Sequence, residues 1–148
     1  MTRAASGTAD EAAIRGVIDA ITAAVRAKDV DAMLAHCSRD IVTFDMVPPL
    51  AHEGVEAVRR VWTRTLAPFE APLEHEVHRL DLVIAEDAAF ARSLNRFGGT
   101  RADGGQAVGW VRSTLGFRRI GGSWKLVHQH VSVPFDMETG EAMVSLRP

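Results

Sequence analysis

The stretch QAVGWVRSTLGFRRI-GG-SWKLVHQHVSV, residues 106–133, decides the fold of this 148-residue chain. Both arms are rich in β-branched and aromatic residues, and the Gly121-Gly122 pair between them is a hairpin signal. If the turn has two residues, His130 opposes Ser113. The stretch therefore predicts two long paired strands, 106–120 and 123–133, with one face that is apolar near the turn and polar further along. Such a face is typical of a core that grades into a pocket.

Further strands and three helices are predicted before this hairpin. Alternating residues predict strands at 73–85 and 88–97, and a short apolar run predicts an extended segment at 41–45. Nearer the N-terminus, apolar residues recur every three to four positions. This spacing predicts a helix behind a Thr8 cap, a short helix capped by Asp29, and a third helix beyond Gly54. Helices followed by antiparallel strands predict an α+β fold, with the helices packed on one face of a curved sheet.

The composition excludes several classes of protein. The chain has 17 Lys and Arg against 19 Asp and Glu, so its net charge of −2 lacks the basic footprint of a nucleic-acid or anionic-membrane partner. Its single cysteine, Cys37, excludes an internal disulfide. No apolar run approaches the roughly 18 residues of a membrane span, and residues 1–10 lack the apolar stretch of a signal peptide. We therefore expect one cytoplasmic domain that binds neither nucleic acid nor membrane.

The order of these elements resembles a known family. The short strand that ends in Asp45, Arg112-x-Thr114, and the run WKLVHQHVSVP at residues 124–134 look like the SnoaL-like branch of the nuclear-transport-factor-2-like superfamily. This superfamily also contains ketosteroid isomerases, polyketide cyclases and limonene-epoxide hydrolases. The resemblance covers roughly residues 10–134. It implies a cone-shaped, curved antiparallel sheet wrapped around the N-terminal helices, an internal pocket for a small apolar metabolite, and a homodimer through the sheet's outer face.

The expected domain boundaries follow from this resemblance. Residues 1–8 are expected to form a flexible N-terminal tail, residues 9–134 the SnoaL-like cone domain, and residues 135–148 a C-terminal tail.

Asp45 is the first candidate for a catalytic residue. Its place at the end of the short strand resembles that of the general-base Asp of ketosteroid isomerases and related cyclases. Flanking apolar residues, Phe44 among them, are expected to desolvate the carboxylate partly and make it a more effective base. The alternative is that Asp45 caps the following turn or pairs with a surface Arg.

The histidines of the last strand are the next candidates. His128 and His130 lie two residues apart and so share a face, where His130 can shuttle a proton or hold a carbonyl oxygen as the catalytic partner of Asp45. Together with Asp45 or His78 the pair can also ligate a metal, but no third ligand is fixed by spacing, so we expect no metal and no cofactor. The alternative is that the histidines are structural and close the floor of the pocket by hydrogen bonding to neighbouring serines.

A further group of side chains is expected to bind the substrate in the same pocket: Phe44, Trp62, Asn95, Ser113, His128 and Ser132. His75 is interpreted as a surface residue. The chain contains no Tyr, which removes part of the oxyanion hole that ketosteroid isomerases make from a Tyr and a protonated Asp. Steroid isomerisation is therefore disfavoured.

The sequence predicts an enzyme that uses acid–base chemistry in an apolar pocket, of isomerase, cyclase or lyase type, on a carbonyl-bearing metabolite. Two alternatives stay open. One is a non-catalytic protein that binds a hydrophobic metabolite or assists a biosynthetic partner, and the other is a metal-dependent variant.

Overall fold

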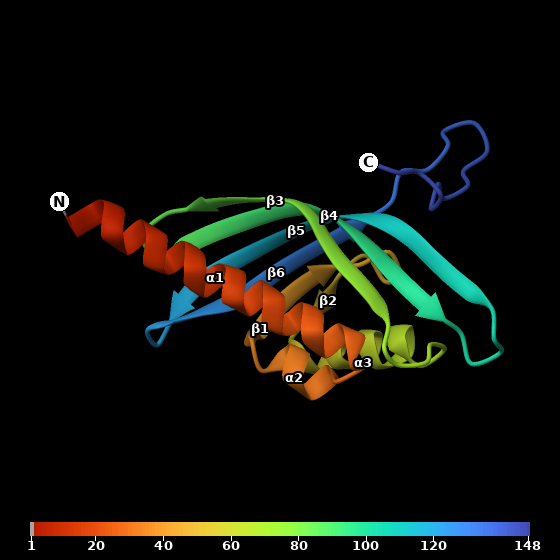
Figure 1. The fold of residues 1–148 in the computed structure, drawn as a ribbon, viewed down its shortest axis with the longest axis horizontal. Coiled ribbons are helices and arrows are strands. Elements are labelled where there is room, and N and C mark those ends of the chain that lie inside the picture. The colour runs from red at the N-terminus through yellow and green to blue at the C-terminus, as the bar shows by residue number, and fades with distance from the viewer. Residues whose placement is uncertain (1) are drawn as a thin grey trace.

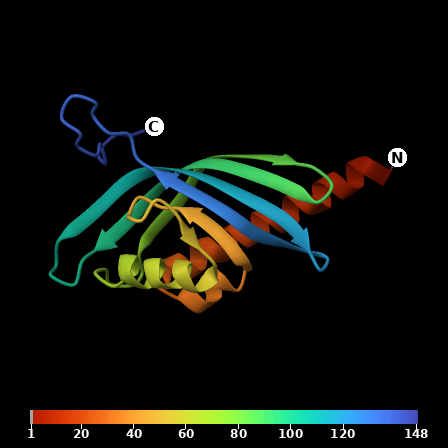
Figure 2. The same cartoon turned by 180° about the vertical axis from the view of Figure 1, so that it is seen from behind.

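The computed structural model describes the backbone of residues 2–148 and the side chains of residues 7–148. Three helices, α1 (Thr2–Arg26), α2 (Val30–Leu34) and α3 (Val55–Leu66), lie on one face of a six-stranded sheet. The sheet curves over them, and α1 runs diagonally across its inner face (Figures 1 and 2). This arrangement confirms the predicted α+β cone. None of the helices in the described part of the chain is both long and apolar enough to cross a membrane.

The strands occur in the spatial order β2-β1-β6-β5-β4-β3. The strand bounds are β1 Cys37–Phe44, β2 His52–Glu53, β3 Glu74–Ile84, β4 Ala88–Thr100, β5 Gln106–Ile120 and β6 Ser123–Ser132. Consecutive strands from β3 to β6 pair antiparallel, as predicted, but β1 pairs with β6 in parallel. The sheet is therefore mixed. Strand β1, the first in the sequence, lies beside β6, the last of the six strands.

The start of α1 differs from the predicted one, whereas the cap of α2 agrees with the prediction. Helix α1 begins at Thr2, so Thr8 lies inside it, and the prediction of a cap at Thr8 was wrong. Asp29 does cap α2, because its side chain accepts a hydrogen bond from the backbone N–H of Ala32 at 2.9 Å. The expectation of a flexible tail includes Met1, which lies outside the described residues.

The final hairpin contains a bulge that the sequence analysis did not anticipate. Near the turn Phe117 pairs with Leu126, as predicted, but Gly116 pairs with His128, so Val127 is an extra residue in β6. A bulge exchanges the two faces of a strand beyond it, because side chains alternate with a period of two. The prediction that His130 opposes Ser113 was therefore wrong: His130 opposes Thr114, and Ser113 opposes Val131.

The core lies between α1, α3 and the inner face of the sheet. It contains a contiguous set of buried apolar side chains: Ile14, Ile18, Leu34, Ile41, Val58, Ala91, Phe117, Trp124 and Leu126. At the hairpin end the core is fixed by Asp10 of α1, whose Oδ1 accepts hydrogen bonds from Arg119 at 2.8 Å and from the indole N–H of Trp124 at 3.1 Å. At the other end of the sheet the core opens into a cavity.

Candidate ligand-binding pocket

A cavity of ≈ 90 Å³ lies between the inner face of the sheet and the helices α1 and α3. A cavity of roughly 150 Å³ holds one benzene ring, so the enclosed space takes only part of a one-ring ligand, and the rest of the ligand lies toward the mouth of the cavity. Most of its lining is apolar, including Trp62 on α3 and Phe97 on β4, whose rings meet edge to face at 6.3 Å. The apolar wall favours an apolar ligand.

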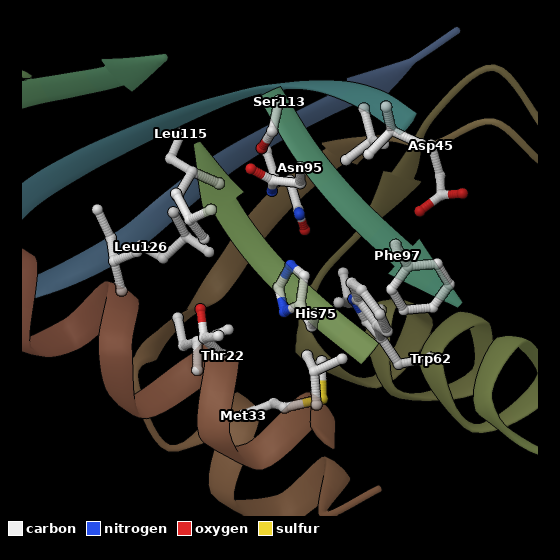
Figure 3. Close-up of a pocket in the computed structure, with 18 of the residues that line it drawn as sticks. Thr22, Met33, Asp45, Trp62, His75, Asn95, Phe97, Ser113, Leu115 and Leu126 are labelled. Carbon is white, nitrogen blue, oxygen red and sulfur yellow. The ribbon is translucent and has the colours of Figure 1, made fainter. Parts of the chain in front are cut away.

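Polar side chains form an arc across this apolar surface. The arc comprises Asp45 directly after β1, Gln129 on β6, Ser113 on β5, Asn95 on β4 and His75 on β3, while Ser93, also on β4, lines the cavity beside Asn95. Figure 3 shows Ser113 and Asn95 on neighbouring strands above the His75 ring, with Trp62 and Phe97 on one side and Asp45 at the edge of the same space. The strand alternation thus brings together residues from distant parts of the sequence.

Asp45 is half-buried and is the one carboxylate among the described residues that line the cavity. Its Oδ1 accepts a hydrogen bond from the backbone N–H of Val47 at 3.3 Å, a long contact that supports the turn after β1. Asp45 therefore both supports the turn and lines the cavity, because its second carboxylate oxygen is available to a ligand.

Hydrogen-bond donors lie on β4 and β5. The hydroxyl of Ser93 donates to Oδ1 of Asn95 at 2.8 Å, and this bond orients the amide and leaves its NH₂ group to donate elsewhere. Ser113 is buried, and its hydroxyl has no hydrogen-bond partner among the described residues. A buried polar group without a partner is rare in native proteins, so these two side chains are suited to an oxygen atom of a ligand.

His75 has a perturbed environment. Burial, with a smaller contribution from the Arg26 cation, lowers the pKa of His75 to about 4. Arg26 is held next to it, since its Nε donates to the backbone carbonyl of His75 at 2.9 Å. The imidazole ring lines the cavity in its neutral form, and its buried Nδ1 has no partner among the described residues.

Cys37 also lines the cavity, yet it is a poor nucleophile there. Burial raises the pKa of its thiol to about 11, so the reactive thiolate is scarce at neutral pH. The site therefore favours proton transfer over covalent chemistry at sulfur.

The structure brings four of the eight predicted site residues together in the cavity: Asp45, Trp62, Asn95 and Ser113. It places the other four on the outer face of the sheet: Phe44, His128, His130 and Ser132. There the Phe44 ring contacts the His128 ring at 4.8 Å and the His130 ring at 5.7 Å. For the three residues of β6 the physical reason is the bulge at Val127, which turns the polar residues beyond it outward.

Two of these outer residues, His128 and Ser132, have hydrogen-bond partners on the sheet. Nδ1 of His128 donates to the backbone carbonyl of Val42 at 2.8 Å, and Ser132 accepts from Nε of Arg112 at 3.1 Å. Asp45 lies on the opposite face from both histidines, so it is not placed to complete a metal site with them. Among the described side chains, no three of His, Cys, Asp and Glu converge as metal ligands.

Sequence reasoning missed several polar residues of the pocket, among them His75 and Gln129. For His75 a signal existed: Leu73, His75 and Val77 alternate across the start of β3, so His75 shares the face of two apolar residues. Gln129 gave no such signal, because only the unpredicted bulge turns it inward.

Comparison with known proteins gave two kinds of match. The model of the SnoaL-like domain family matches residues 14–136. Among solved structures, an NTF2-like protein of unknown function from Pseudomonas putida KT2440 is 38% identical, with a TM-score of 0.86 over 95% of this chain and 98% of that one. No curated protein matches the chain.

More distant structures share the fold alone. A ketosteroid isomerase-like protein from Erwinia carotovora atroseptica is 22% identical, with a TM-score of 0.69 over 82% of this chain and 93% of that one. A proposed dehydratase of the NTF2-like family from Streptomyces avermitilis is 18% identical, with a TM-score of 0.74 over 84% of this chain and 96% of that one.

Proposed function

The chain belongs to the SnoaL-like domain family, and from this premise we propose that it is an enzyme of acid–base chemistry on a small, neutral, carbonyl-bearing metabolite. The reaction is of isomerase, cyclase or lyase type, and Asp45 is its general base. The family fold alone does not give this function, since one fold hosts many activities, so the proposal depends on the site.

The observation that carries the proposal is a single carboxylate at the edge of a cavity that also holds an unpaired hydroxyl and an oriented amide. Asp45 is the one acidic group among the described lining residues, and Asn95 and Ser113 offer an amide N–H and a hydroxyl farther along the same face. An apolar wall that excludes water strengthens each of these interactions.

The arrangement fits removal of a proton from a carbon next to a carbonyl group. The Asp45 carboxylate takes the proton, the electrons of the broken C–H bond form a C=C bond, and the carbonyl π electrons move to oxygen. The amide of Asn95 and the hydroxyl of Ser113 donate to that oxygen as its negative charge grows. The proton then returns to another atom in an isomerisation, or a leaving group departs in an elimination.

The test is exchange of the α-protons of cyclohexanone in D₂O, followed by ¹H NMR. General-base catalysis contributes about 10²–10⁴-fold, so Asp45→Asn is expected to slow the protein-dependent exchange by about 100-fold or more. Its melting temperature is expected to stay within about 2 °C of the wild type, since Asp45 makes only one long hydrogen bond.

Asp40→Asn is the matched control, because Asp40 is exposed on the same strand and outside the cavity. Undiminished exchange in Asp45→Asn contradicts the proposal, and so does a loss of exchange accompanied by a fall of many degrees in melting temperature. A wild type that catalyses no exchange yet retains a hydrophobic metabolite through purification supports the non-catalytic alternative, which the apolar lining also suits.

We propose further that two copies of the chain associate through the outer face of the sheet. Large apolar side chains on that face are exposed, including Phe44 at 41% and Phe90 at 44%. Exposed apolar side chains grouped on one face are typical of protein–protein contacts.

A further inference from the structure

The proposed proton transfer does not use two polar residues of the arc, Gln129 and His75, and of these His75 is the one with a buried polar atom that lacks a hydrogen-bond partner among the described residues. It lines the cavity, and its ring contacts the edge of Phe97 with centroids 6.0 Å apart. Nδ1 is buried and has no hydrogen-bond partner among the described residues. An unpaired buried polar atom costs about 1–3 kcal/mol, and each such group in a native structure calls for an explanation.

The position of His75 separates it from Ser113, the other cavity-lining residue with an unpaired buried atom among the described residues. His75 pairs with Phe97 on β4, whereas Ser113 pairs with Ser93, four residues along the same strand. Along a strand, the backbone of four residues spans about 13 Å. Strand β3 lies two strands from β5, which separates the two backbones by about 10 Å more across the sheet. One ligand atom reaches about 3 Å to each partner, so it does not serve both groups. The cavity thus has two polar points.

The charges around His75 select a neutral group at this second point. The Arg26 guanidinium next to the ring disfavours a ligand cation. No Lys or Arg is among the described lining residues, so an anion finds no direct partner, and Asp45 repels it. Burying an unpaired charge in an apolar wall is far more costly than burying a neutral polar group.

We propose that His75 binds a hydroxyl group of the ligand, so that the substrate is a neutral hydroxy ketone with its carbonyl oxygen at Asn95 and Ser113 and its hydroxyl at His75. The carbonyl end of this assignment rests on the proposed function, and the hydroxyl end rests on His75 alone. A neutral imidazole has one N–H donor and one acceptor nitrogen. A hydroxyl both donates and accepts, so it pairs with the ring whichever nitrogen holds the proton.

The experiment compares two one-ring probes that differ only at the far end, 4-hydroxycyclohexanone and 4-methylcyclohexanone. Dissociation constants are measured by protein-observed NMR for the wild type and for His75→Phe, which keeps a ring and removes its hydrogen bonds. The readout is the ratio of the methyl to the hydroxyl dissociation constant. A net hydrogen bond of about 1 kcal/mol predicts a fall of about fivefold in this ratio on His75→Phe.

His78→Phe is the matched control, because His78 is exposed on the same strand and contacts Trp110 at 5.0 Å, outside the cavity. Its ratio is expected to stay within twofold of the wild type. If His75→Phe leaves the ratio unchanged, or if His78→Phe lowers it equally, the inference is overturned.

A second measurement needs no variant at position 75. The ¹⁵N resonances of the His75 ring in the wild type are expected to shift with the hydroxyl probe and to move much less with the methyl probe. Equal responses overturn the inference. Both readouts are taken at binding equilibrium, so failure of α-proton exchange leaves them unaffected, and an unchanged ratio in His75→Phe leaves the role of Asp45 unaffected.

Discussion

At the scale of single residues, His75 makes the folded protein sensitive to acid. Its pKa falls from 6.5 to about 4 on folding, so the unfolded chain takes up this proton first as the pH is lowered. Its effect on the free energy of unfolding is absent above about pH 6.5. Between about pH 6.5 and pH 4 stability is lost, by about 2–3 kcal/mol at about 1.4 kcal/mol per pKa unit.

This effect is measured by urea unfolding of the wild type and of His75→Phe at pH 7.5 and pH 4.5. The wild type is expected to lose about 2 kcal/mol more than the variant between the two pH values. His78→Phe, on the exposed face of the same strand, is expected to behave as the wild type. A parallel loss in the wild type and in His75→Phe shows that other groups cause the acid sensitivity.

Residue-level sequence reasoning predicted part of the cavity lining. Asp45, Trp62, Asn95 and Ser113 were predicted from strand ends, helix stripes and family resemblance, and all four line the cavity. The interpretation of His75 as a surface residue overlooks that its neighbours in the alternation are apolar. A polar residue inside an apolar alternation is the better indicator of a pocket.

At the scale of elements, Gly98 determines whether β4 and β5 pair closely. A Cβ atom at this position would lie 1.9 Å from the backbone carbonyl oxygen of Ala107, and Gly98 has a φ of +141°. Backbone atoms move less easily than a side chain, so Gly98→Ala is expected to lower the free energy of unfolding by about 3 kcal/mol or more.

Gly104→Ala separates the steric effect from the backbone strain. Gly104 also has a positive φ, +86°, but a Cβ atom there meets nothing within 4 Å. A loss of only about 1–2 kcal/mol is expected, from the left-handed conformation alone. Equal losses in the two variants, measured by urea unfolding, contradict the close approach of β4 and β5.

The elements themselves were predictable, but their register was not. The bounds of β5 agree with the predicted 106–120, because Gly121-Gly122 marks the turn and strand-forming residues continue on both sides. Val127 carries no local signal of a bulge, since any β-branched residue suits a regular strand. That single extra residue places His128 and His130 on the outer face.

At the scale of the whole molecule, the proposed association of two copies is tested by sedimentation velocity. The chain has a mass of 16.1 kDa, and the wild type is expected to sediment as a species of twice that mass. Phe90→Asp places a charge on the outer face, and is expected to yield the monomer, because burying an unpaired carboxylate is costly.

Leu50→Asp is the control, since Leu50 is 97% exposed in the loop after β1. It is expected to leave the mass unchanged. A wild type that sediments at the mass of one chain, or a Phe90→Asp variant that remains dimeric, contradicts association through this face.

The parallel pairing of β1 with β6 has a consequence for the order of folding. In the described sheet β1 lies between the two-residue strand β2 and β6, and β6 is synthesised after the other five strands. The helices and the first strand therefore wait, with one edge of the sheet unpaired, until nearly the whole chain has been synthesised. Contacts between residues so far apart in sequence slow folding. A nascent chain that stalls before β6 exposes this unpaired edge, and the wall of the pocket that carries Asp45 closes last.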